Sequence, residues 1–225
     1  MNPALVGVCA ATGVAVGPAL DLCVTRVPAK VPVLRPGARD ELRPGRAAVL
    51  GAANGALFAA MAVRFDGSWA LPAFLVLAAA LLTLSVIDFE HFLLPNRLVY
   101  PTGMAVAVLL ALAAIGDSEG GSLLRAVIGA AGGFAAMFVL HLLSPRSLGF
   151  GDVRLSFVLG LALGWVGGGE VVLGLFLGFL YGALIGVVLI ATRTRRRTDH
   201  VPFGPFLAAG ALTAILWGDT ILSWS

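Results

Sequence analysis

Eight apolar segments follow one another along the chain, and they constrain its fold more than any other feature. The segments are approximately 4–24, 47–63, 69–88, 98–115, 123–143, 153–166, 170–192 and 202–220. A helix needs about 20 apolar residues to cross the hydrocarbon core of a bilayer, and most segments approach that length. Their apolar runs are continuous rather than alternating, which argues against a β-barrel. The sequence therefore predicts an all-α polytopic membrane protein with about eight transmembrane helices, forming a single domain over residues 1–225.

The count of eight depends on how the stretch 153–192 is divided. Only Gly167, Gly168, Gly169 and Glu170 interrupt its apolar residues, so seven segments is the alternative count. One helix of about 40 residues would be about 60 Å long, twice the ~30 Å thickness of the hydrocarbon core. Two crossings joined at the glycines are the better interpretation. Composition agrees, because only 12% of the residues are charged, against about 25% in soluble domains.

Basic residues gather in the connections on one side of the predicted bundle. With eight spans, that side receives the connections 25–46, 89–97, 144–152 and 193–201. Thirteen of the fifteen Lys and Arg residues lie there when Arg154, at the following helix start, is included. The positive-inside rule places these connections, including the short 25–46 loop, in the cytoplasm and both termini outside. This pattern indicates contact with membrane lipid and no binding of nucleic acid.

Two acidic residues lie at segment ends on the predicted cytoplasmic face. Asp88 closes the third segment and Asp152 opens the sixth, so both fall at one membrane depth. Two carboxylates in this arrangement can share a proton and activate a water molecule between them. The alternative for each is an ordinary solvated acid at the interface. We predict a functional pair, because an ionisable residue recessed in a membrane protein is costly without a role.

The residues around Asp152 indicate how it is placed. Gly149 and Gly151 precede it, and glycine permits positive φ and close backbone approach. The segment 153–166 is only about 21 Å long as a helix, so the Gly149–Gly151 turn is expected to dip below the membrane surface. The helix dipole favours a charged Asp152 at an N-terminal end. Asp88, at a C-terminal end, is expected to hold the shared proton.

Four short stretches, in order along nearly the whole chain, resemble motifs of the type IV prepilin peptidases, which are GxGD-type intramembrane aspartyl proteases. They are Gly17–Pro28, Ile87-Asp88 with Pro95-Asn96, Gly149-Phe150-Gly151-Asp152 with Arg154, and Pro202–Gly210. The resemblance implies that Asp88 and Asp152 are the catalytic pair of an aspartic endopeptidase in the bacterial inner membrane. It also implies that the partner is a prepilin or pseudopilin precursor, cleaved after its leader at the cytoplasmic face. This chemistry needs no metal and no organic cofactor.

The sequence departs from the family pattern at two places. Many members carry two CxxC pairs in the loop after the first span, interpreted as a zinc site, and methylate the new N-terminus with S-adenosylmethionine. Here the loop 25–46 contains no cysteine, so we expect cleavage without methylation. S-adenosylmethionine would be a cofactor only if methyltransferase activity is retained. Asp21 stands where the family usually has Asn, and we expect it to pair with Arg26.

Several residues near the predicted pair are candidates for supporting roles. Glu90 and His91 follow Asp88 and are interpreted as tuning it or binding the substrate leader, with a solvated loop as the alternative. The remaining supporting candidates come from the motifs and comprise Pro95, Asn96, Gly149, Gly151, Arg154, Pro202, Gly204 and Pro205. The last three are expected to wall the site.

Two other classes of function are alternatives. A proton- or cation-coupled transporter favours carboxylates near the bilayer midplane and inverted repeats, and the sequence indicates neither. A non-catalytic membrane scaffold homologue is expected to lack one of the aspartates, and both are present. Among substrates, type IV pilin, Flp/Tad-type pilin and type II secretion pseudopilin precursors all stay open.

Overall fold

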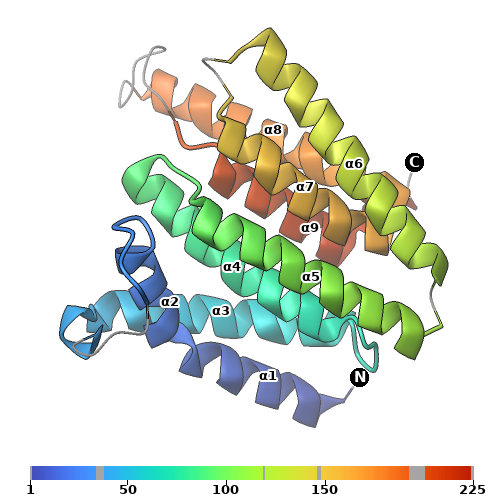
Figure 1. Ribbon diagram of the computed structural model, residues 1–225, viewed down its shortest axis with the longest axis horizontal. Helices are drawn as coiled ribbons and strands as arrows, with labels where there is room; N and C mark the ends of the chain where they lie inside the picture. The colour runs from blue at the N-terminus through green and yellow to red at the C-terminus, as the bar shows by residue number, and fades with distance from the viewer. Residues whose placement is uncertain (1, 34–37, 119, 146–147, 193–200, 224–225) are drawn as a thin grey trace. The chain divides into compact units, whose positions relative to one another are not determined.

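The computed structural model describes residues 2–33, 38–118, 120–145, 148–192 and 201–223 (Figure 1). Helices account for every regular element in these ranges, and no strand occurs among them. The α-helices are α1 Pro3–Ala15, α2 Gly17–Arg26, α3 Pro44–Arg64, α4 Leu71–His91, α5 Asn96–Gly116, α6 Gly120–Leu143, α7 Phe150–Val166, α8 Gly168–Ala191 and α9 Gly204–Leu222, with a short 3-10 helix, η1, at Ala38–Glu41. The predicted all-α fold is confirmed. Arg35, Arg146 and Arg193–Arg197, part of the basic connections, lie outside the described ranges.

The helices match the predicted segments closely. Seven described stretches are long and apolar enough to cross a membrane, namely Pro3–Arg26, α3, α4, α5, α6, Gly168–Leu189 and α9. The 17-residue α7 supplies the eighth segment. Gly167 caps α7 and α8 begins at Gly168, so the stretch 153–192 consists of two helices, as predicted. The protein is therefore a multi-pass membrane protein, and the orientation of its termini stays a prediction.

The first apolar segment is divided into two helices. α1 ends at Ala15 and α2 begins at Gly17, with Val16 between them. Pro18 explains the break, because its ring lacks an N–H and clashes with the carbonyl one turn earlier in a continuous helix. The Val16 carbonyl instead accepts from the N–H groups of Ala19 and Leu20, at 2.9 and 3.1 Å. Hydrophobicity alone predicted one segment here because it does not register this break.

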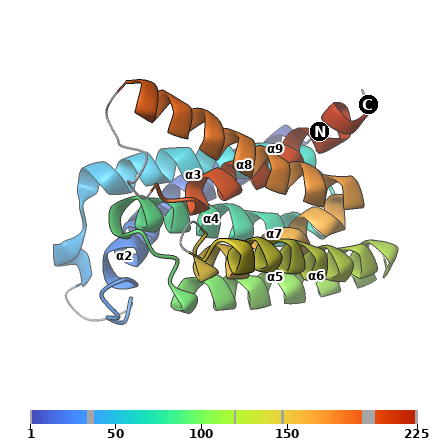
Figure 2. The ribbon, with the colours of Figure 1, turned by 90° about the horizontal axis from the view of Figure 1, so that it is seen from above.

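The described helices form two compact units. The first contains α1 to α5, in which α3 contacts α1, α2 and α4, and α5 packs on α4. The second contains Phe92–Leu94 with α6 to α9. Within it α7 lies between α6 and α9 (Figure 1), and α8 packs along α9 (Figure 2). Most residues of α7 are buried, so this helix is largely covered by other parts of the protein.

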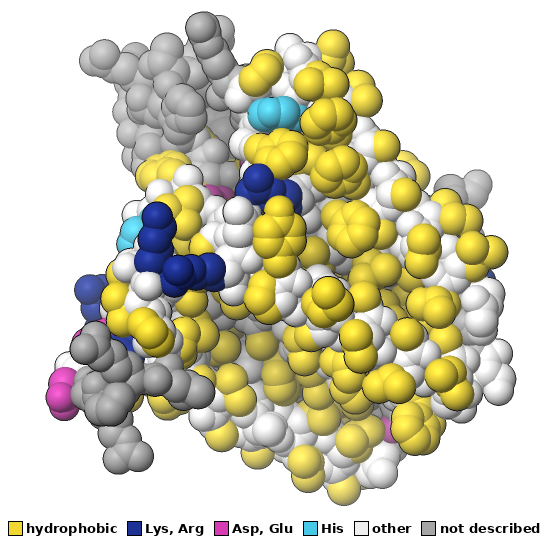
Figure 3. Space-filling model, in the orientation of Figure 1, with side chains coloured by type: hydrophobic (Ala, Val, Ile, Leu, Met, Phe, Trp, Pro, Cys, Tyr) yellow, Lys and Arg dark blue, Asp and Glu magenta, His cyan; other side chains and the backbone are white. Residues whose placement is uncertain are grey.

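Hydrophobic side chains predominate on the surface seen in Figure 3. Large apolar residues are widely exposed, including Ile115 at 78%, Val172 at 71% and Met104 at 69%. A water-soluble protein rarely exposes so continuous an apolar surface, whereas lipid solvates it without cost. The exposed surface therefore agrees with the membrane-spanning helices.

Candidate active site

Asp88 lies in the last turn of α4, three residues before the helix ends at His91. It is 5% exposed. The preceding Ile87 is fully buried in an apolar cluster with Leu20 and Val24 of α2 and Leu50 of α3. This packing holds the end of α4 against two other helices of the first unit. The predicted position of Asp88 at a C-terminal helix end is confirmed.

A polar network centred on Arg46 ties the same end of α4 to α2 and α3. Arg46 lies in the first turn of α3, and its Nε donates to the carboxylate of Asp21, which is fully buried. Its Nη1 donates to both carboxylate oxygens of Glu90, at 3.0 and 3.1 Å, and its Nη2 donates to Thr25 Oγ1 at 2.5 Å. Asp21 also accepts the backbone N–H of Arg43 at 2.9 Å. One guanidinium thus joins three helices within two residues of Asp88.

The predicted pairing of Asp21 with Arg26 is wrong. Five residues along a helix place two side chains about 140° apart, so these two cannot face each other on α2. Arg26 instead binds Glu41 of η1 through two hydrogen bonds of 2.9 Å. It also donates to the carbonyls of Pro32 and Val33, both at 3.1 Å. The described part of the 25–46 loop is therefore ordered by an arginine.

The candidates that follow Asp88 have defined structural positions. Glu90 is held by Arg46, and His91 is the exposed last residue of α4. Pro95 is the N-cap of α5, and its carbonyl accepts from Leu98 and Val99 at 2.9 and 3.1 Å. Asn96 begins α5. Their roles toward a substrate stay predictions.

Asp152 occupies the first turn of α7 in the second unit. Gly149 is the N-cap, so Asp152 is the third helical residue, and its carboxylate accepts the Gly149 N–H at 3.2 Å. This is half of a capping box, since the glycine has no side chain to return the bond. Asp152 is 7% exposed. Its place at a helix N-terminus, where the dipole favours an anion, is as the sequence predicted.

Gly149 and Gly151 serve close packing and not an unusual backbone conformation. Gly149 has φ −69° and ψ 146°, and Gly151 is already helical. The expected non-helical turn therefore ends at Gly149, since α7 begins at Phe150, and its depth in the membrane stays a prediction. A Cβ on Gly151 would lie 3.1 Å from Cβ of Leu94, and one on Gly149 would lie 3.2 Å from Oδ2 of Asp152. Side chains at these positions would press on the groups around Asp152.

Aromatic contacts anchor the start of α7. The guanidinium of Arg154 lies over the Phe150 ring, 4.5 Å from its centroid. The His141 ring of α6 lies 5.5 Å from the same ring, and its Nδ1 is 2.7 Å from the Leu148 carbonyl. These contacts fix the entry to α7. Arg154 therefore contacts the first residue of α7, and its role toward a substrate stays a prediction.

The last motif begins α9. Pro202 is buried just before the helix, Phe203 is its N-cap, and Gly204 and Pro205 are its buried first residues. The Phe203 ring lies 4.8 Å from the ring of Phe179 on α8. The motif thus packs α9 against α8. Whether these residues also wall a site at Asp152 stays a prediction.

The candidates fall into two groups. Asp88, Glu90, His91, Pro95 and Asn96 belong to the first unit, and the remaining candidates belong to the second unit. The pairing of Asp88 with Asp152 therefore stays a prediction. Within the described ranges, no three or more His, Cys, Asp or Glu side chains are grouped so as to hold a metal ion.

Sequence reasoning missed the part played by Arg46. The sequence places Arg46 in a basic connection, and nothing there links it to Glu90, 44 residues away. One signal was available: Asp21 is an acid inside an apolar segment and requires a basic partner. The partner came from the next helix instead of the same one.

Comparison with known proteins agrees with these motifs. Residues 75–191 match the type IV leader peptidase family. A prepilin leader peptidase/N-methyltransferase of Aeromonas hydrophila is 34% identical over 176 residues, covering 75% of this chain and 57% of the relative. The protein of the same name from Bacillus subtilis is 32% identical over 170 residues, covering 75% and 64%. That from Pseudomonas aeruginosa is 34% identical over 168 residues, covering 72% and 54%.

The matches cover only part of each relative. The chain spans between about half and two thirds of the length of these relatives. No solved structure matches. The family match nevertheless covers more than half of the chain and includes both Asp88 and Asp152. This protein belongs to the type IV leader peptidase family.

Proposed function

We propose that this protein is a membrane-embedded aspartic endopeptidase that removes leader peptides from type IV pilin-like precursors. The observation that carries the proposal is a nearly buried carboxylate at each of the two motif positions, Asp88 at 5% and Asp152 at 7% exposure. Both acids lie in terminal helical turns. This position does not favour the transporter alternative, which expects carboxylates near the bilayer midplane.

The chain itself limits how far apart the two acids can be. Leu94 packs against Gly151, the residue before Asp152, within the second unit. Leu94 comes only six positions after Asp88 in the sequence. Six residues span at most about 20 Å when fully extended. The connection 89–93 is therefore short enough to allow an active site shared by the two acids.

The proposed chemistry needs one water molecule and one shared proton. Asp152, as the carboxylate, takes a proton from the water whose oxygen attacks the scissile carbonyl carbon. Asp88, as the acid, donates its proton to the carbonyl oxygen, giving a tetrahedral intermediate. When the intermediate collapses, the C–N bond breaks and the hydroxyl proton returns to Asp88. Asp152 passes its proton to the leaving amine nitrogen, which restores both groups.

The proposal places the reaction at the cytoplasmic face of the bacterial inner membrane. The positive-inside distribution supports this side, because Asp88 and Asp152 adjoin connections that carry most of the basic residues. The relatives' names also include N-methyltransferase. We propose cleavage without methylation, because the 25–46 loop of this chain contains no cysteine.

Co-expression with candidate prepilins tests the proposal. Leader removal is scored by the gel mobility of the pilin, using type IV, Flp/Tad-type and pseudopilin precursors in turn. Asp88→Asn and Asp152→Asn should each abolish processing of whichever precursor the wild type cleaves. The expected loss is at least about a hundredfold, the usual contribution of a general acid or base.

Asp40→Asn is the matched control, because Asp40 is an exposed acid of η1. It should process normally, and all three variants should reach wild-type levels in the membrane. Normal processing by either motif variant would refute the aspartic mechanism.

A further inference from the structure

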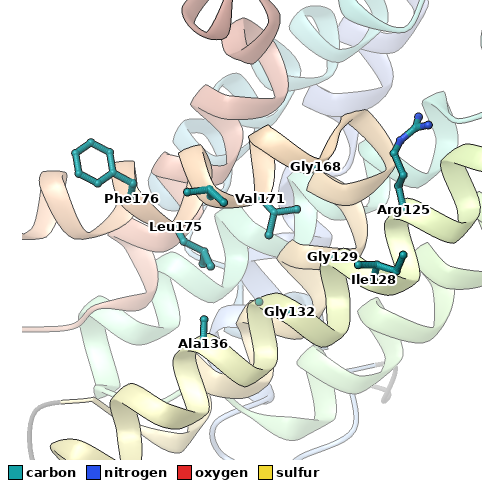
Figure 4. Close-up of a pocket in the computed structure, with 11 residues that line it drawn as sticks. Arg125, Ile128, Gly129, Gly132, Ala136, Gly168, Val171, Leu175 and Phe176 are labelled. Atoms are coloured by element: carbon teal, nitrogen blue, oxygen red, sulfur yellow. The ribbon is translucent and has the colours of Figure 1, made fainter. Parts of the chain in front are cut away.

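An apolar groove of about 530 Å³ runs along the second unit between α6 and α8 (Figure 4). Glycines of α6, Gly129, Gly132 and Gly133, form one side, and Val172 and Phe176 of α8 form the other. Val172 is 71% exposed and Phe176 is 59% exposed. The groove is therefore open to the surroundings of the protein, which at these helices are lipid.

A single cation stands at one end of the groove. Figure 4 shows Arg125 at the same end as Gly168, with Ala136 and Phe176 toward the other end. Arg125 is exposed, and its Nη2 donates to Ser122 Oγ at 2.7 Å. Among the described residues it forms no ion pair. Its guanidinium has five N–H donors, so it can bind an anionic oxygen while it retains Ser122.

The length of the groove matches one leaflet of a bilayer. Arg125 and Ala136 are eleven residues apart on α6, or about 16 Å along the axis. One leaflet contributes about 15 Å of hydrocarbon, half of the core. A transmembrane substrate helix would need a groove of about twice this length. The dimensions therefore fit an acyl chain whose head group remains at the membrane surface.

The groove belongs to the leaflet remote from Asp152. Gly164, near the end of α7, packs so closely on α6 that a Cβ there would lie 2.5 Å from the Arg125 carbonyl. Gly164 is twelve residues, or about 18 Å, along α7 from Asp152. We propose that this groove binds one acyl chain of an anionic glycerophospholipid of that leaflet, with its phosphate on Arg125.

Lipid retention by the full-length protein tests this site. The detergent-purified protein is mixed with phosphatidylglycerol or phosphatidylcholine carrying identical acyl chains, and native mass spectrometry counts the retained lipids. The wild type should retain one phosphatidylglycerol about fivefold better than phosphatidylcholine, the effect of roughly one basic residue near anionic lipid. Arg125→Gln should lose this preference, and Arg125→Lys should keep it.

A second pair of variants tests the apolar part of the groove. A Cβ on Gly132 meets nothing within 4 Å, so Gly132→Leu fills the groove without a clash at its base. Gly186 of α8 is equally open but does not line the groove, so Gly186→Leu is the matched control. Gly132→Leu should lower retention of both lipids, and Gly186→Leu should leave it unchanged. Any one of three results would overturn the proposal. They are equal retention of the two lipids by the wild type, a preference for phosphatidylglycerol that survives Arg125→Gln, and equal effects of Gly132→Leu and Gly186→Leu.

Discussion

Individual glycines differ sharply in what surrounds them. A Cβ on Gly160 of α7 would lie 2.2 Å from the Gly129 carbonyl of α6, whereas a Cβ on Gly132 meets nothing. Helices in membranes associate through such small-residue contacts, because hydrophobicity does not drive them together there. Gly160→Ala should therefore lower the free energy of unfolding by about 1 to 3 kcal/mol through overpacking. Gly132→Ala should raise it by up to about 1 kcal/mol through helix propensity.

Thermal unfolding of the two variants in one detergent, followed by circular dichroism, makes the comparison. Equal shifts of the midpoint would contradict the packing at Gly160. The example also shows what sequence can say of a glycine. The sequence marked Gly149 and Gly151 as candidates, but it did not reveal that a Cβ on Gly151 would meet Leu94, because Leu94 is distant in sequence.

At the scale of helices, Arg46 joins α2, α3 and α4 through two acids in different environments. The side chain of Asp21 is 0% exposed and that of Glu90 is 38% exposed. Asp21→Ala should lower the free energy of unfolding by about 3 kcal/mol, because it breaks a buried ion pair. Glu90→Gln should lower it by less than about 1 kcal/mol, as expected for an exposed pair. Chemical denaturation in mixed micelles can measure both changes.

Glu41→Gln is the control for Glu90→Gln, since Glu41 is a 48% exposed acid paired with a different arginine. A larger loss for Glu90→Gln than for Asp21→Ala would contradict the assignment of Asp21 as the principal partner. This network was beyond sequence reasoning because its members lie on three helices. The helices themselves were predictable within a few residues, since each apolar segment is long and continuous. The break at Val16 was not predictable, because the hydrophobicity of a segment does not reveal the effect of Pro18 on the helix.

At the scale of the whole molecule, the two carboxylates lie in separate compact units, one in each. The sequence predicted both acids at helix ends, and this is confirmed. It predicted their pairing only through topology and resemblance, because α5 and α6 lie between the two acids in the sequence. The pairing therefore calls for a direct measurement of proximity in the intact protein.

Cysteine cross-linking measures that proximity. In a background with Cys9 and Cys23 replaced by Ala, Asp88→Cys with Asp152→Cys should be joined by a short bis-thiol reagent, because two acids that share a water must lie close together. Ser68→Cys with Asp117→Cys is the positive control, since those side chains are 2.8 Å apart.

The negative control pairs Asp88→Cys with Asp219→Cys. Asp219 follows Gly218, which contacts Glu170 at the start of α8, the opposite end of α7 from Asp152. This pair should not be joined, and mass spectrometry of the linked peptides identifies the product in each case. If the Ser68 and Asp117 positions are joined efficiently but the Asp88 and Asp152 positions are joined no better than the negative control, the two acids do not share a water. The aspartic mechanism would then fail even if each aspartate proved essential alone.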